Sequence, residues 1–392
     1  MSMTMYVQHG YGKGDKVQRL LREGNASGVV LSPADETADG LAVTAADARG
    51  FGATVLLDPQ LYVSTIPDGT ARRHEVNSLD FSGVRWSAGT ELVHAHVEQI
   101  LDLNHRVGTT AVIAPAPLQT AFLDTWASVT FQYARETMRL AGTPTYVSVV
   151  VDESALGDWN PIAQWLNEVT TLDCEGFYLV IARRDRPYPQ IWDAALLTNL
   201  LRIVYRLGVL NRYTVIWGFT DVAGLLSLAA GADAFGCGWF YSLRNFTSAK
   251  WVPKTGGGVP TARVLSPGFL SPVEALGEGG PIARSSVGET AFPDRALRSR
   301  LSNDESMPVG EARLQHLQAL GAMAADLGSE GPARSASDAL GLVERVDGLL
   351  AVAQAGLTET ERLGIALATR YHTGVNQLRQ ALKSFAEHEG LV

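Results

Sequence analysis

Cysteine is scarce in this chain, with only Cys174 and Cys237 among its 392 residues. They lie far apart in sequence and match neither zinc-ligand spacing nor a disulfide framework. The sequence also lacks any pair of histidines four residues apart, so no helix face carries two histidine ligands one turn apart. We therefore predict no metal site, and the lack of a disulfide framework fits the reducing cytoplasm.

Basic residues are outnumbered, 32 to 41, which gives a formal net charge of −9. Bulk charge therefore argues against non-specific nucleic-acid binding and leaves a local basic rim as the route to nucleic acid. The sequence lacks any apolar run near the roughly 18 residues of a membrane span. Its first residues, MSMTMYVQHG, lack a basic stretch followed by an apolar one. We expect a cytoplasmic protein with no membrane association.

Short apolar runs alternate with longer amphipathic stretches, which is typical of βα units and a parallel sheet. Eight strands are predicted, at 5–9, 28–32, 54–58, 111–115, 146–152, 177–182, 214–218 and 234–238. Helices are predicted between them, among others at 15–23, 91–106, 193–207 and 221–230. Eight strands favour an α/β fold of the closed (β/α)8 TIM type. The count depends on strand 5–9, and without it an open sheet or an incomplete barrel is the better interpretation.

The sequence divides into three parts. Residues 1–249 are predicted to form the barrel, with an insertion at 60–89 whose Pro-Asp-Gly turn at 67–69 indicates a small hairpin over the barrel mouth. Residues 250–305 are rich in Gly, Pro and Ser and are expected to form a linker or extended loop. Residues 306–392 are predicted to form a helical subdomain of three helices, the third starting at a capping box of Thr358 and Glu361. This tail is expected to pack on the barrel, on a second copy or on a partner protein.

Carboxylates stand at the ends of two predicted strands. Asp58 ends the third strand, and Asp152 ends the fifth with Glu153 beside it. Catalytic groups of this fold lie at strand C-termini, and two carboxylates across one mouth can act as nucleophile and general acid in glycosyl transfer. We predict catalytic roles for Asp58, Asp152 and Glu153. The alternative is that one of them caps a helix or pairs with Arg183 or Arg184.

Glycines mark the ends of the seventh and eighth strands. Gly218 and Gly238 would let backbone N–H groups approach a phosphate, and Trp239 could stack on a planar base. His9 ends the first strand and is a candidate for substrate binding. The alternative is that these glycines serve only packing and turns, and that the aromatic residues contact the C-terminal helices.

Basic residues follow the sixth and eighth strands. Arg183 and Arg184 could bind a phosphate or carboxylate with two hydrogen bonds each, and Arg244, Lys250 and Lys254 could extend the same rim. A surface ion-pair cluster is the alternative.

Two resemblances follow from these segments. The segment GFTDVAGLLSLAAGADAFGCGW resembles the phosphate-binding end of flavin- and phosphate-binding barrels, which implies FMN as a cofactor. The architecture, the carboxylates Asp58 and Asp152, and RLQHLQALG after the barrel resemble the tRNA-guanine transglycosylase superfamily. That resemblance implies a carboxylate nucleophile on a ribose carbon. The zinc site of three cysteines and a histidine found in that family's tRNA enzymes cannot be built from two cysteines, which puts tRNA as the substrate in doubt.

Three functions are compatible with these features. The first is a barrel enzyme that transfers or hydrolyses a glycosyl or ribosyl group on a phosphate-bearing, base-containing substrate such as a nucleotide. The second is a flavin-dependent oxidoreductase, which would be yellow when purified. The third is a barrel without catalysis that acts as a binding or structural subunit.

Overall fold

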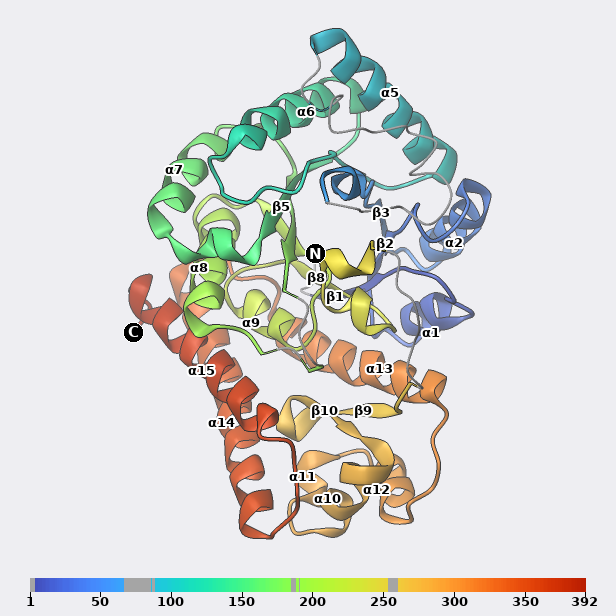
Figure 1. Ribbon diagram of the computed structural model, residues 1–392, viewed down its shortest axis with the longest axis vertical. Helices are drawn as coiled ribbons and strands as arrows, with labels where there is room; N and C mark the ends of the chain where they lie inside the picture. The colour runs from blue at the N-terminus through green and yellow to red at the C-terminus, as the bar shows by residue number, and fades with distance from the viewer. Residues whose placement is uncertain (1–3, 67–85, 87–88, 185–187, 190, 253–259) are drawn as a thin grey trace.

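The centre of the molecule is an eight-stranded parallel sheet with the strand order β3-β2-β1-β8-β7-β6-β5-β4 (Figure 1). The computed structural model describes residues 4–392 except 67–85, 87–88, 185–187, 190 and 253–259. The strands are β1 Thr4–Gln8, β2 Gly28–Leu31, β3 Thr54–Leu57, β4 Val112–Ile113, β5 Thr145–Asp152, β6 Gly176–Ala182, β7 Thr214–Trp217 and β8 Ala234–Cys237. All eight predicted strands are confirmed, including the first.

The sheet curls into a nearly closed barrel. Strand β1 pairs with β2 on one side and with β8 on the other, where Met5 is in register with Phe235. The remaining edges, β3 and β4, meet near Thr110, whose backbone N–H donates to the Val55 carbonyl at 2.8 Å. The Val55 N–H in turn donates to the Thr110 hydroxyl at 2.9 Å. The TIM-type barrel predicted from the sequence is therefore confirmed.

Strand composition explains why this sheet is buried on both faces. Every residue of β6 is buried, and so is every residue of β5 except Asp152 at its end. Inward side chains fill the barrel and outward ones contact the surrounding helices, so consecutive positions must be apolar. Those helices are α1 Lys16–Arg22, α2 Ala38–Gly50, α5 Thr90–Val107, α6 Thr125–Ala141, α7 Trp159–Val169, α8 Ala194–Tyr205 and α9 Ala223–Ala229. Gly108 ends α5 with a left-handed φ of 77°, as its position after the apolar pattern predicts.

The helix that completes the ring comes from far along the chain. Helix α13 (Val309–Leu327) lies against β1, α1 and α9. Gly321 of α13 lies so close to the Asn25 backbone that an added Cβ would overlap the Asn25 carbonyl. Beside it, Gln318 donates to Glu23 at 2.6 Å. The first helix of the tail predicted at 306–392 therefore packs on the barrel.

The last two helices pack on the barrel's outside. Helix α15 (Arg370–His388) lies on α8, where Tyr205 and Phe385 meet edge to face at 5.7 Å. Helix α14 (Ala336–Arg362) contacts α9 and α15. The predicted capping box is wrong, because Thr358 lies inside α14 and its hydroxyl donates to the Gln354 carbonyl at 2.9 Å. The α14 helix ends instead near Gly364, whose φ of 69° suits glycine.

The segment predicted as an extended loop is folded. Strands β9 (Arg263–Ser266) and β10 (Ser271–Glu274) form an antiparallel pair, followed by α10 Gly280–Arg284, α11 Gly288–Ala291 and α12 Arg295–Ser302. In Figure 1 they form a lobe beside α13 and α14. Val264, Leu265 and Val273 are fully buried, so apolar burial outweighs the turn-forming composition.

The remaining expectations concern two loop segments and membrane spans. The glycine run at 256–258 and the turn at 67–69 of the insertion lie outside the described residues. Among the residues that are described, none of the helices combines the length and apolar composition needed to cross a membrane.

Candidate functional site

Asp58 is a buried carboxyl at the C-terminal end of β3. Only 1% of the residue is exposed. Its Oδ2 accepts hydrogen bonds from the hydroxyls of Tyr62 at 2.8 Å and Tyr178 at 3.3 Å, and its Oδ1 accepts from the backbone N–H of Gln60 at 3.1 Å. Burial raises the pKa of Asp58 to about 6, although these hydrogen bonds and the charge of Lys250 pull it down. The carboxyl can therefore gain and lose a proton near neutral pH.

Lys250 acts electrostatically on Asp58 and lies beside a second carboxylate, Asp35. Its Nζ lies 3.8 Å from Oδ2 of Asp35, which also accepts from the Ser32 hydroxyl at 2.7 Å. Burial lowers the pKa of Lys250, and the charges of Asp35 and Asp58 oppose that shift. The Lys250 charge therefore acts on both acids. We call Asp35, Asp58, Tyr62, Tyr178 and Lys250 the Asp58 cluster.

Two buried amides adjoin the Asp58 cluster. Oε1 of Gln8 lies 3.4 Å from the Tyr178 hydroxyl oxygen, and Oε1 of Gln60 lies 2.9 Å from the Ser32 hydroxyl oxygen. The Nε2 groups of Gln8 and Gln60 have no hydrogen-bond partner among the described residues. A buried donor without an acceptor costs roughly 1–3 kcal/mol, so these amides are ready to donate to a ligand or to water.

The other two predicted carboxylates have different partners. Asp152 caps the short turn Glu153–Gly157, accepting from the Ser154 backbone N–H at 2.9 Å and from its hydroxyl at 2.5 Å. No hydrogen bond joins Asp152 to Asp58 in the part of the chain that is described. Asp152 thus has the alternative role of a cap, and its pairing with Asp58 across one mouth stays a prediction.

Glu153 takes part in a buried ion pair. Its Oε2 lies 2.7 Å from Nε of Arg183, and its Oε1 accepts from the Arg184 backbone N–H at 3.2 Å. The Arg183 guanidinium lies 3.5 Å from the centre of the Trp192 ring. Arg184 is largely exposed and lies 3.8 Å from Glu153. Glu153 and Arg183 thus neutralise each other's buried charge.

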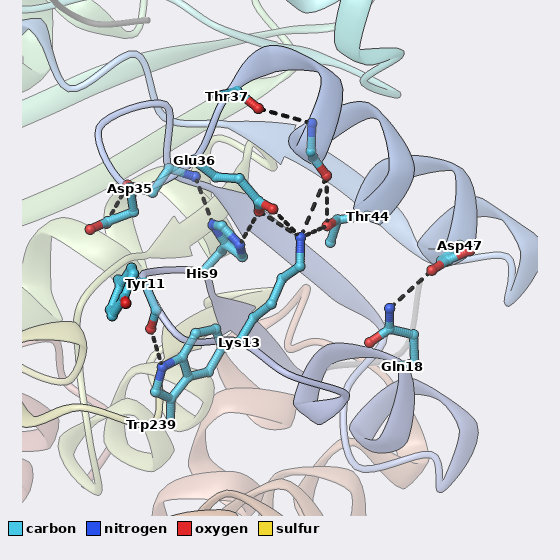
Figure 2. A network of polar contacts seen from close by, with 12 residues as sticks. His9, Tyr11, Lys13, Gln18, Asp35, Glu36, Thr37, Thr44, Asp47 and Trp239 are labelled. Carbon is cyan, nitrogen blue, oxygen red and sulfur yellow. Dashed lines mark hydrogen bonds and ion pairs between the residues drawn. The ribbon is translucent and has the colours of Figure 1, made fainter. Parts of the chain in front are cut away.

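His9 and Trp239 belong to a polar network that reaches Asp35 of the Asp58 cluster through Ser32 (Figure 2). His9 Nε2 lies 3.1 Å from Glu36, which also binds Lys13 at 2.5 Å. The His9 hydrogen bond is the largest cause that lowers the pKa of Glu36 to about 2, and Lys13 adds to it against the effect of burial. Trp239 lies edge-on to His9 and donates from Nε1 to the Tyr11 carbonyl at 2.9 Å. A groove of about 390 Å³ runs along this network between residues 10–14 and 35–37.

Gly218 and Gly238 occupy tightly packed positions. A Cβ at Gly218 would overlap the Tyr178 hydroxyl, and one at Gly238 would overlap the Gln8 carbonyl and Leu243. The Gly218 N–H already donates to the Leu179 carbonyl at 2.9 Å. Gly218 therefore fits the packing alternative, and the anion and FMN expectations gain no support from its N–H.

One group of side chains has the composition of a metal site. Ligand atoms of Asp221, Cys237 and His316 all lie within 4.8 Å of one another, but His316 is hydrogen-bonded to Asp221 at 2.7 Å. Burial raises the pKa of the Cys237 thiol well above neutrality, whereas metal binding needs the thiolate. The buried guanidinium of Arg244 acts on all three groups and opposes a further cation. These residues fit a metal poorly.

Sequence reasoning missed three members of the Asp58 cluster and gave a fourth a different role. Asp35 follows the second strand by three residues, a signal that could have been used. Tyr178 lies within an apolar strand and Tyr62 within the insertion, and neither pattern shows which way a hydroxyl points. Lys250 was assigned to a basic rim, because its approach to Asp35 depends on the path of a long loop.

Comparison with protein-family models and with curated proteins finds no match. Among solved structures, the chain is similar to a GH3-family glycosyl hydrolase from Mycobacterium smegmatis, with 14% identity, coverage of 81% of this chain and 94% of that one, and a TM-score of 0.38. It is also similar to beta-N-acetylhexosaminidase from Beutenbergia cavernae, with 12% identity, coverage of 82% and 96%, and a TM-score of 0.39. A third is thiamine phosphate pyrophosphorylase from Pyrococcus furiosus, with 11% identity, coverage of 64% and 91%, and a TM-score of 0.33. The resemblance to tRNA-guanine transglycosylases stays a prediction.

Proposed function

We propose that the protein is a barrel enzyme that transfers or hydrolyses a glycosyl or ribosyl group on a phosphate-bearing, base-containing substrate, with Asp58 as its acid–base group. One observation carries the proposal: a carboxyl at the C-terminal end of a barrel strand whose pKa is raised to about 6. A group with that pKa is present in both protonation states near neutral pH. It can therefore donate a proton to a leaving oxygen or nitrogen and take it back from the acceptor.

Asp35 supplies the second carboxylate that this chemistry needs. Its side chain is 20% exposed and lies beside the Lys250 ammonium, so its environment differs from the closed surroundings of Asp58. Pairs of carboxylates in unlike environments divide into an acid and a nucleophile or base. In the proposed reaction Asp58 protonates the leaving group. Asp35 then attacks the sugar carbon or activates the water that does so.

The tyrosines and amides have supporting roles in the proposed reaction. Burial, and next the Asp58 charge, raise the pKa values of Tyr62 and Tyr178, so both hydroxyls remain donors and hold Asp58 in one orientation. The unpartnered amides of Gln8 and Gln60 would donate to sugar hydroxyls. A sugar presents many such acceptors, which suits a site with surplus buried donors.

The proposal is tested by turnover on a panel of nucleosides, nucleotides and aryl glycosides. Asp58→Asn should lower kcat by about 10²–10⁴-fold, the usual contribution of a general acid, while circular dichroism stays native. Asp152→Asn is the matched control, because it changes the same residue type at the end of another strand and should leave kcat within about twofold. Equal turnover of Asp58→Asn and the parent protein would reject the proposal.

A further inference from the structure

A second site lies where the barrel meets the last helix. A pocket of about 80 Å³ opens beside the ends of β6, β7 and β8 and is closed by β10 and the start of α15. Its lining includes three arginines, Arg183, Arg244 and Arg370, and the aromatic residues Trp192, Trp217, Tyr188 and Tyr241. A water needs roughly 10–15 Å³ by this measure, so the space holds several waters or one phosphate-sized group.

Arg244 and Arg370 have donors left over. Arg244 is 7% exposed, donates to the Gly238 carbonyl at 2.7 Å and to Tyr188 at 3.3 Å, and its Nη2 has no hydrogen-bond partner among the described residues. The buried Nε of Arg370 also lacks one there. A guanidinium cannot lose its charge in a protein, so a buried N–H that lacks an acceptor among the described residues favours binding of an added acceptor.

The charges of the pocket leave a positive surplus. Arg183 is balanced by Glu153 at 2.7 Å. Burial would raise the pKa of Asp221, but the charges of His316 and Arg244 outweigh it and lower the pKa, so Asp221 balances Arg244. The Asp221 carboxylate is in turn hydrogen-bonded to His316 at 2.7 Å. Among the described residues Arg370 has no ion-pair partner, and its charge comes from an element that does not belong to the barrel.

We propose that this pocket binds the phosphate group of a small molecule, with Arg244 and Arg370 as its ligands and the aromatic wall against the adjoining ring or sugar. Arginine is the side chain best matched to phosphate oxygens, because its planar fork offers parallel N–H groups. The inference rests on the proposed function for its ligand class, since that function names a phosphate-bearing substrate. Its residues and geometry are nevertheless independent of the Asp58 cluster.

Calorimetry with inorganic phosphate on the full chain tests the site, with sodium chloride at equal ionic strength as the reference titration. We expect saturable binding of one phosphate per chain. Arg370→Gln, at a partly exposed helix start, should weaken that binding about tenfold, which is the loss of one charged hydrogen bond. Arg362→Gln, at an exposed arginine that pairs with Glu359, should bind phosphate like the parent protein. Arg244→Lys, which keeps the charge but loses the fork, should weaken binding similarly.

The outcomes separate this inference from the proposed reaction. Absence of saturable phosphate binding, or equal affinity of Arg370→Gln and the parent chain, would overturn the site, whatever the enzyme assays give. Should Arg244→Lys fail to fold, the Arg370→Gln comparison still decides. Asp58→Asn should retain phosphate affinity, because Asp58 does not line the pocket. Phosphate binding that depends on Arg370 together with no turnover on any substrate would reject the reaction and keep the site.

Discussion

At the scale of single residues, Asp58 costs the folded state stability once it ionises. Its pKa of about 6 in the folded protein lies above the 3.8 of an unperturbed aspartate, so the unfolded chain releases this proton first as pH rises. The contribution favours folding below about pH 4 and is lost as pH rises through 6. A shift of about two units corresponds to about 3 kcal/mol.

Replacing Asp58 should therefore stabilise the protein at high pH. Asp58→Asn cannot ionise, so we expect it to raise the free energy of unfolding by up to about 3 kcal/mol at pH 8 and to change it little at pH 4. Urea denaturation at both pH values measures this difference. Asp152→Asn serves as the control. If Asp58→Asn were less stable than its parent at pH 8, the raised pKa of Asp58 would be contradicted.

Glu153 illustrates the opposite case of a charge that the fold requires. Glu153→Ala leaves the buried Arg183 without its counter-ion, so we expect a loss of about 3–5 kcal/mol in the free energy of unfolding. Glu359→Ala removes an exposed partner of Arg362 and should cost at most about 1 kcal/mol. Urea denaturation of both variants at pH 7 makes the comparison. Similar losses for the two would show that the Glu153 pair is not buried in solution.

At the scale of elements, α13 depends on a glycine for its approach to the barrel. Gly321→Ala places a methyl group on the Asn25 carbonyl, and the overpacking should cost about 1–3 kcal/mol. Gly341→Ala, in α14, meets nothing within 4 Å and should instead stabilise the protein by up to about 1 kcal/mol through helix propensity. Thermal unfolding distinguishes these opposite signs. A stabilising Gly321→Ala would mean that α13 does not pack on the barrel at Asn25 as described.

Elements were predictable where burial imposes a simple pattern. Strands β5 and β6 are apolar at consecutive positions because both faces are covered, and that pattern survives in the sequence. Strands β9 and β10 lack such a run of consecutive apolar residues, because each is only four residues long and turn-forming residues lie between them. Side-chain partners were harder to predict: Tyr178 meets Asp58 across 120 residues of sequence, and no local pattern encodes such a contact. The positions of Asp58 and Asp35 near strand ends were thus foreseeable, but the two tyrosines beside Asp58 were not.

At the scale of the whole molecule, we expect the barrel and its tail to unfold as one unit, because α13 and α15 pack on the barrel. A chain ending at residue 305, where the sequence pattern divides, lacks α13 and exposes the apolar face between the first and last strands. We expect such a chain to lose cooperative thermal unfolding and near-ultraviolet circular dichroism, whereas the full chain shows both. Native-like cooperative unfolding of residues 1–305 would show that the barrel folds without α13.

The late position of α13 in the sequence also affects the order in which the nascent chain can fold. Translation adds about 5–20 residues each second, so a helix encoded far along the chain is made seconds after the strands that it covers. Here β8 ends at Cys237 and the helix that covers it begins only at Val309. The lobe of β9 and β10 leaves the ribosome in between. For several seconds the nascent protein therefore exposes the apolar surface that α13 later covers. We expect a chaperone to protect the chain most during that interval.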